Sequence, residues 1–162
     1  LALGDALAVV LLDARGFKAE DFARSHPGGA LGRRLLTHVS DVMRRGEHLP
    51  SVGPSTPFTG LMREMSAKGL GASAVVDDHG QVLGIFTDGD LRRLVEKGAD
   101  LRTTTAGEVM HPRPLTIRED ALAAEAASLM EQHRITSVLV IDANGRLCGA
   151  VNSNDLMRAK VI

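Results

Sequence analysis

The stretches DDHGQVLGIFTDGDL at residues 77–91 and DANGRLCGAVNSNDL at residues 142–156 align without a gap. Each reads as a strand, a turn, a second strand and the polar start of a helix, and the Asn-Gly pair at 144–145 is a strong hairpin signal. A repeat of this length is a whole folding unit. The chain therefore contains one unit twice, and differences between the copies indicate which of two equivalent sites is built for a ligand.

The composition is that of a globular chain without a strongly charged partner. Of 162 residues, 44% are apolar and 2% aromatic, and the net charge is -1, which does not favour nucleic-acid binding. The apolar run at 6–12 is far shorter than the ~20 residues of a membrane span, and a basic leader is missing. The single cysteine, Cys148, suits a reducing compartment. We expect a cytoplasmic protein that binds neither nucleic acid nor a membrane.

Both copies are predicted to follow the order β-α-β-β-α. In the first copy Pro57 begins a helix that Gly69 ends, and in the second Thr105 and Glu108 have the spacing of a capping box. The remaining predicted elements of the first copy are a helical turn at 40–43, strands at 49–52, 72–77 and 82–87, and a helix at 88–97. Those of the second copy are strands at 115–117, 137–142 and 147–152, and helices at 121–133 and from 153.

Residues 1–36 lie outside the repeat. Apolar residues at helical spacing predict a helix over 3–11 that Gly16 ends. A second helical piece at 19–23 leads into the breaker-rich run SHPGGALG at 25–32, which predicts a loop. Because the chain opens inside an amphipathic pattern, we expect it to be part of a longer protein.

Thr87 and Asp90 stand where a strand meets a helix start in the first copy. The free amides of a first helical turn can hold a phosphate beside the Thr87 hydroxyl, and Asp90 can accept two hydroxyl groups of a ribose. Gly84 lets neighbouring backbone come close, and Arg92 and Arg93 offer charge for a phosphate. The same Thr-x-x-Asp spacing also fits a helix cap that needs no ligand.

The second copy departs from this pattern. Asn152 replaces the threonine, so the carboxylate survives as Asp155 while the hydroxyl does not. This site is expected to bind more weakly, to bind something different, or to be structural. His133 and Arg134 align with Lys68 and Gly69, so this arginine is absent from the first copy; either they contact a phosphate or they are a solvated helix end.

The repeat resembles a tandem pair of CBS domains over residues 38–162. The resemblance is carried by GIFTDGD at 84–90 and by the Val-Met pairs at 42–43 and 109–110. It implies an α+β fold in which two β-α-β-β-α units pack as one disc, with domains at 38–98 and 105–162. It also implies a nucleotide-type ligand. The six methionines are expected to fill gaps in the core, and only Met43 and Met110, at the start of each unit, are also placed to line a ligand cleft.

The first residues are similar to the end of the sugar isomerase (SIS) domain in the bacterial arabinose 5-phosphate isomerase family. The similarity is carried by LALGDALA at 1–8 and SHPGGALGR at 25–33, and it implies a domain boundary near residue 37. Members interconvert ribulose 5-phosphate and arabinose 5-phosphate for synthesis of Kdo, a sugar acid of lipopolysaccharide. His26 corresponds to a catalytic histidine of the family. The other SIS residues are missing, so this chain alone is expected to be inactive.

The resemblance implies a regulatory module that needs no cofactor. Its expected ligand is the sugar nucleotide CMP-Kdo or an adenine nucleotide; the alternative is a module that binds no ligand and holds isomerase subunits together. The implied assembly is a homodimer of CBS pairs, and a homotetramer of the full-length enzyme. The six histidines lack metal-ligand spacing, so no metal site is expected. The predicted ligand-binding residues are Thr87, Asp88, Asp90, Arg92, Arg93, His133, Arg134, Asn152, Asn154 and Asp155.

Overall fold

The computed structural model describes residues 36–162. The predicted helical pieces before residue 36, the loop at 25–32 and His26 lie outside the described residues. The first unit contains α4 (Val39–Val42), the 3-10 turn η1 (Gly46–His48), β1 (Ser51–Val52), α5 (Phe58–Lys68), β2 (Ala72–Val76), β3 (Val82–Thr87) and α6 (Asp88–Glu96). The second contains α7 (Ala106–Val109), β4 (His111–Pro112), β5 (Thr116–Arg118), α8 (Ala123–His133), β6 (Ser137–Ile141), β7 (Leu147–Asn152) and α9 (Ser153–Arg158).

Each unit is built around a small mixed sheet. β1 runs parallel to β2 and β5 parallel to β6, while the hairpins β2-β3 and β6-β7 are antiparallel. At the two hairpin turns an aspartate carboxylate accepts two backbone amides, from His79 and Gln81 at Asp77 and from Asn144 and Arg146 at Asp142. The predicted α+β fold with two β-α-β-β-α units is confirmed.

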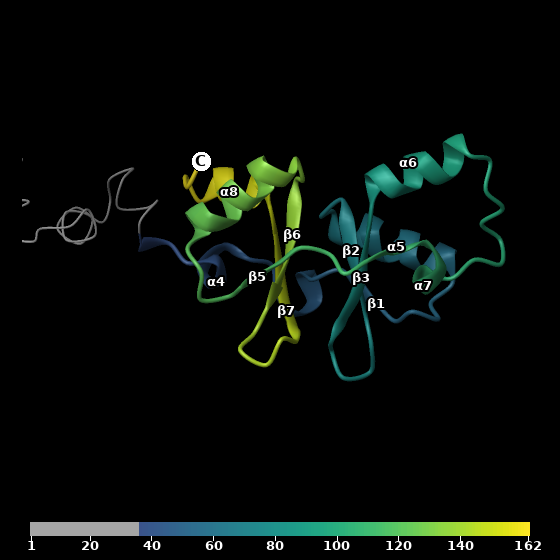
Figure 1. Cartoon of the computed structure of the whole chain (residues 1–162), viewed down its shortest axis with the longest axis horizontal. Coiled ribbons are helices and arrows are strands. Elements are labelled where there is room, and N and C mark those ends of the chain that lie inside the picture. Colours follow the sequence, from purple (N-terminus) through teal and green to yellow (C-terminus); the bar gives the residue numbers. More distant parts are fainter. Residues whose placement is uncertain (1–35) are drawn as a thin grey trace, which may run out of the picture.

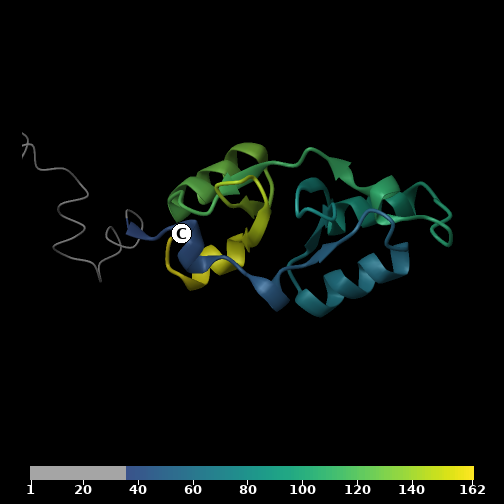
Figure 2. The ribbon, with the colours of Figure 1, turned by 90° about the horizontal axis from the view of Figure 1, so that it is seen from below.

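Each unit begins with a short leading helix, α4 or α7, and each leading helix packs into the other unit. Val39 of α4 is fully buried in the core of the second unit, together with Val138 and Leu156. Ala106 of α7 is fully buried in the first unit, in the cluster that contains Phe86. Figure 2 shows α4 alongside α9, far from the rest of its own unit. Each core is therefore completed by a residue that the chain places in the other copy.

A fourth strand joins the first sheet, which the sequence did not predict. β4 follows α7 and pairs with β3, where Gly84 lies opposite Pro112. In the second unit a backbone bridge between Arg44 and Ala150 occupies the same position. The extended segment after each leading helix thus docks on the second hairpin strand of the other copy. Glycines 84 and 149 make room for it, as proposed from the sequence for Gly84.

Small side chains join the two units along the middle of the molecule. Ala72 and Ala74 on β2 share a buried cluster with Leu139 on β6 and Ala150 on β7. The backbone amide of Leu147 also donates to the carbonyl of Gly80, 2.9 Å away, which ties the two hairpins together. Figure 1 shows the sheets side by side, each with its longer helices on the outer side. The units therefore form one body.

We expect Gly84→Ala to lower the free energy of unfolding by about 1–3 kcal/mol, as overpacking does. An added Cβ would lie 2.5 Å from the Met110 sulfur and 2.9 Å from the His111 carbonyl oxygen. Urea denaturation followed by circular dichroism measures the change. Gly53→Ala is the control, because its Cβ meets nothing nearer than Thr56 at 4.0 Å. Equal unfolding midpoints for the two variants would contradict the close docking of β4.

Candidate functional site

Thr87 and Asp90 form a complete capping box at the start of α6. The Thr87 hydroxyl oxygen accepts the Asp90 amide at 3.2 Å, and Oδ2 of Asp90 accepts the Thr87 amide at 2.9 Å. The same Oδ2 also accepts the Thr87 hydroxyl proton at 2.7 Å. The cap that the spacing permitted is therefore real, and any ligand of this carboxylate meets an already ordered helix start.

The other oxygen of Asp90 faces an arginine of its own helix. Arg93 Nη2 lies 2.6 Å from Asp90 Oδ1, and the Arg93 side chain is 62% exposed. Burial opposes ionisation of Asp90, but the hydrogen bonds from Thr87 and Arg93 outweigh it and hold the pKa of Asp90 below its usual range. Asp90 is thus ionised at neutral pH, beside a cation that is free to swing into solvent.

The second copy keeps the cap with a different side chain. Oδ1 of Asn152 accepts the Asp155 amide at 2.9 Å, and Oδ2 of Asp155 accepts the Asn152 amide at 3.1 Å. Asn152 caps α9 as the sequence suggested, and it is buried. Replacement of the threonine therefore preserves the helix start and removes one hydroxyl.

Asp155 is held by an arginine from the other unit, which sequence reasoning missed. Arg44 Nε lies 3.0 Å from Oδ2 and Nη2 lies 3.2 Å from Oδ1, while Nη1 donates to the carbonyl of Lys68 at 2.9 Å. Only 19% of the Arg44 side chain and 9% of Asp155 are exposed. No local pattern could show this pair, because the extended segment after α4 brings Arg44 beside β7 through a backbone bridge to Ala150.

An open hollow of 630 Å³ lies around this pair. It is lined by Met43, Arg44, Arg45, His48, Lys68, Gly69, Asp155 and Arg158. Met43 belongs to the buried core and also lines this hollow; that it lines a ligand cleft stays a prediction. Apart from Asp155, its charged walls are basic, so the surface is suited to an anion.

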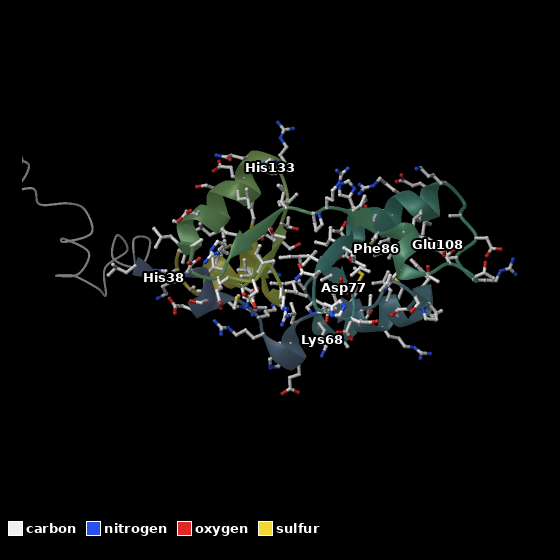
Figure 3. All side chains as sticks on the ribbon, turned by 60° about the horizontal axis from the view of Figure 1, so that its bottom comes forward. His38, Lys68, Asp77, Phe86, Glu108 and His133 are labelled. Atoms are coloured by element: carbon white, nitrogen blue, oxygen red, sulfur yellow. The ribbon has the colours of Figure 1, made fainter. Side chains whose placement is uncertain are left out.

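The same exchange places different residues beside the first copy. His111 pairs with Ile85 as Arg44 pairs with Ala150, so a histidine stands where the second site has its arginine. Arg134 ends α8 with φ 53°, in the place where Gly69 ends α5 with φ 61°. No hydrogen bond or ion pair joins Arg134 to Thr87 or Asp90 within residues 36–162. In Figure 3 the helix ends at Lys68 and His133 lie on opposite sides of the molecule.

The remaining predicted residues lie at the surface. Four of them are exposed: Asp88, Arg92, His133 and Asn154. The backbone amide of Asp88 donates to the Gly71 carbonyl. Across the described residues, no three His, Cys, Asp or Glu side chains are grouped to hold a metal ion. Burial raises the pKa of the Cys148 thiol to about 11, so it behaves as a small apolar residue. No helix in the described part of the chain is long and apolar enough to span a bilayer.

We expect Arg44→Ala to cost about 1.5–3 kcal/mol of unfolding free energy, because it leaves a mostly buried carboxylate without its charged donor. Arg93→Ala is the matched control in the first copy. The pair that Arg93 forms with Asp90 lies within one helix, and such pairs contribute about 0.3–0.5 kcal/mol to the unfolding free energy. Chemical denaturation of both variants at pH 7 measures the difference. Equal costs would show that the Arg44–Asp155 pair contributes no more than a surface pair.

The capping box predicts a pH dependence for α6. Because the folded-state pKa of Asp90 is lowered, its stabilisation is complete above its ordinary value near ~4 and is lost as the pH falls through the lowered value. Asp90→Asn is expected to be about 0.5–1 kcal/mol less stable than the original chain at pH 7. The difference in unfolding free energy between Asp90→Asn and the original chain should narrow below pH ~4, as measured by denaturation at a series of pH values. A difference that stays constant with pH would contradict the capping role of the Asp90 carboxylate. So would an equal, pH-dependent difference for the exposed control Asp78→Asn.

Comparison with known proteins gives the family. The CBS domain model matches residues 39–97 and 106–162. Arabinose 5-phosphate isomerase KdsD of Pseudomonas aeruginosa is 56% identical over 162 residues, all of this chain and 50% of the relative. The Escherichia coli protein of that name is 48% identical over the same length and 49% of the relative. The chain thus spans about half the length of the curated relatives it matches.

Solved structures agree with this result. CBSX2 in complex with AMP is 27% identical with a TM-score of 0.64, over 76% of this chain and 95% of that one. CBSX2 from Arabidopsis thaliana gives 26% identity and a TM-score of 0.63, over 76% and 93%. The exchanged helices, the two capping boxes and the matched ranges lead to one conclusion: this chain belongs to the CBS domain family, as a tandem pair.

Proposed function

We propose that this chain is the regulatory CBS pair of a bacterial arabinose 5-phosphate isomerase, and that it binds a nucleotide or sugar nucleotide beside Thr87 and Asp90. The observation that carries the proposal is the contrast between the two carboxylates. Asp90 is paired with an exposed arginine of its own helix, whereas Asp155 is locked by Arg44 of the other unit. A ligand can displace Arg93 at modest cost, because the Arg93 side chain is 62% exposed, although Asp90 is only 17% exposed.

Asp90 is suited to the diol of a ribose. It is ionised, it is fixed by the Thr87 amide and hydroxyl, and its Oδ1 faces outward to Arg93. Hydrogen bonds to a carboxylate are roughly twice as strong as neutral ones. Once Arg93 turns aside, it offers its charge to the phosphate of the same ligand.

Two arginines of the second copy that adopt a left-handed backbone conformation support a phosphate ligand. Arg113 and Arg134 have φ values of 52° and 53°, while the corresponding first-copy residues, Gly46 and Gly69, adopt the same conformation as glycines. A left-handed conformation costs a non-glycine residue about 1–2 kcal/mol. The presence of arginine at these two positions, in spite of this cost, is explained if the guanidinium charges bind a ligand.

This chemistry and the relatives support a nucleotide-type ligand. The AMP complex of CBSX2 supports the nucleotide class. CMP-Kdo is the finer proposal, because it joins a ribose and a phosphate to a carboxylate that an arginine can bind. In that setting the longer protein interconverts ribulose 5-phosphate and arabinose 5-phosphate in the cytoplasm with His26 in its active site, and the pair reports the level of a later product.

The second candidate function is an interaction module without a ligand. A shallow hollow along the outer face of α8 favours it, because two small residues there, Ala124 and Ser128, leave room for another helix; the hollow is lined by Ala124, Glu125, Ser128, Leu129 and Gln132. Such a module would hold homodimers of the pair and a tetramer of the isomerase in register. The ligand titration below separates the two functions.

Titration of the intact protein with CMP-Kdo, CMP, AMP and ATP tests the proposal. A ligand at a hundred times its Kd stabilises the folded state by about 2.7 kcal/mol, which raises Tm by several degrees. We expect saturable stabilisation by at least one of them, and its loss in Asp90→Ala but not in the exposed control Asp78→Ala. Absence of any shift at millimolar ligand would reject sensing and leave the interaction module.

A further inference from the structure

We propose that Asn144 is a site of spontaneous covalent modification, at which the side-chain amide is lost as ammonia and the main chain rearranges to isoaspartate. Asn144 and Gly145 lie in the turn between β6 and β7. The inference goes beyond the proposed function and does not depend on ligand binding. It concerns a joint between the two units, at the end of β7 opposite the cap of α9.

The reaction needs the two neighbouring residues and water. The backbone nitrogen of Gly145 loses its proton and bonds to Cγ of Asn144, the C–N bond of the side-chain amide breaks, and ammonia leaves with that proton. The product is a succinimide ring. Water opens the ring at either carbonyl, which gives aspartate by one route and isoaspartate, joined through its side-chain carbon, by the other. No electrons are transferred, so no oxidant or reductant is required.

Asparagine is a thermally labile residue, and Asn144 is the one asparagine of this chain that precedes a glycine. Gly145 has no side chain to hinder the approach of its nitrogen, and its φ of 76° lies in the left-handed region. Asn152 is buried, and its Oδ1 already accepts the Asp155 amide. Asn154 lies within α9, where helical hydrogen bonds fix the backbone. The chain therefore directs the reaction to Asn144.

The folded turn exposes the reacting side chain and holds the reacting backbone. Asn144 is exposed, and its amide group makes no hydrogen bond within residues 36–162. Asp142 accepts the Asn144 backbone amide on its carboxylate at 2.8 Å and the Gly145 amide on its carbonyl at 3.1 Å. Ring closure breaks the second bond, because the Gly145 nitrogen gives up its proton. The fold thus slows the reaction, and opening of the turn accelerates it.

The modified turn lies beside the contact that joins the two hairpins. The Leu147 amide donates to the Gly80 carbonyl at 2.9 Å, and a backbone bridge pairs Arg146 with Gln81. Isoaspartate inserts one extra carbon atom into the main chain directly before these residues. The Asp142 carboxylate and the Gly80 carbonyl then lose aligned donors. The modification is therefore expected to loosen the tie between the units.

The first copy provides a turn of matched backbone that cannot lose ammonia. It carries His79 and Gly80 where the second copy carries Asn144 and Gly145. Gly80 has a φ of 80°, and the Asp77 carboxylate accepts two backbone amides, as the Asp142 carboxylate does. Because the backbones agree, the difference in reactivity between the two turns comes from the asparagine side chain.

Peptide mass spectrometry of the intact chain, aged in mildly alkaline buffer, tests the site. We expect the peptide that contains Asn144 to gain one mass unit, faster as the pH rises because the Gly145 nitrogen must lose a proton. An isoaspartyl methyltransferase should label the same peptide. Asn144→Gln is the matched control, since the longer side chain closes a less favourable ring. No mass gain in the folded chain, or an equal gain at Asn152 and Asn154, would overturn the proposal.

Hydrogen exchange of the Leu147 amide tests the structural consequence. In the isoaspartate form we expect exchange on the order of fivefold faster than in the fresh chain, as loss of one backbone hydrogen bond produces. Asn144→Asp adds the same charge without the extra backbone atom, so it should keep the protection of the fresh chain. Unchanged exchange in the isoaspartate form would overturn the loosened joint. Equally fast exchange in Asn144→Asp would overturn the role of the rearranged main chain.

Discussion

The exchange of the leading helices is the interaction on which the rest of the structure depends. Val39 completes the core of the second unit and Ala106 that of the first, and both are fully buried. Neither unit has a closed core without the other, so the pair is expected to fold as one cooperative body. The same exchange lays an extended segment across each second hairpin strand, where glycines 84 and 149 leave room for it. Both candidate sites border these crossings.

The two sites share a backbone and differ in charge. A capping box fixes each aspartate at a helix start, through Thr87 in one copy and Asn152 in the other. The first aspartate faces an exposed arginine of its own helix, and the second is locked by Arg44. The repeated backbone therefore places two aspartates in equivalent positions, and a few neighbouring side chains make their surroundings different.

Local features were predictable from the sequence because neighbouring residues create them. Gly69 ends α5 in the left-handed conformation, Thr105 and Glu108 form their capping box, and the strands of both hairpins lie within a residue or so of their predicted positions. β4 was not predicted, since a two-residue strand exists only through its partner, and His111 and Pro112 carry no strand pattern. The weak second site predicted from Asn152 stays untested, but the structure adds Arg44 as a stronger reason for a difference.

The repeat at 77–91 and 142–156 determined by itself the fold class, the hairpins and the two capped aspartates, because hydrophobic period, turn residues and helix caps act over a few positions. Only the tertiary structure decided which partner each aspartate has. Arg44 and Asp155 lie far apart in the chain, and they meet because the leading helix of one copy is buried in the other. Long-range packing sets that contact, and no spacing within either copy records it.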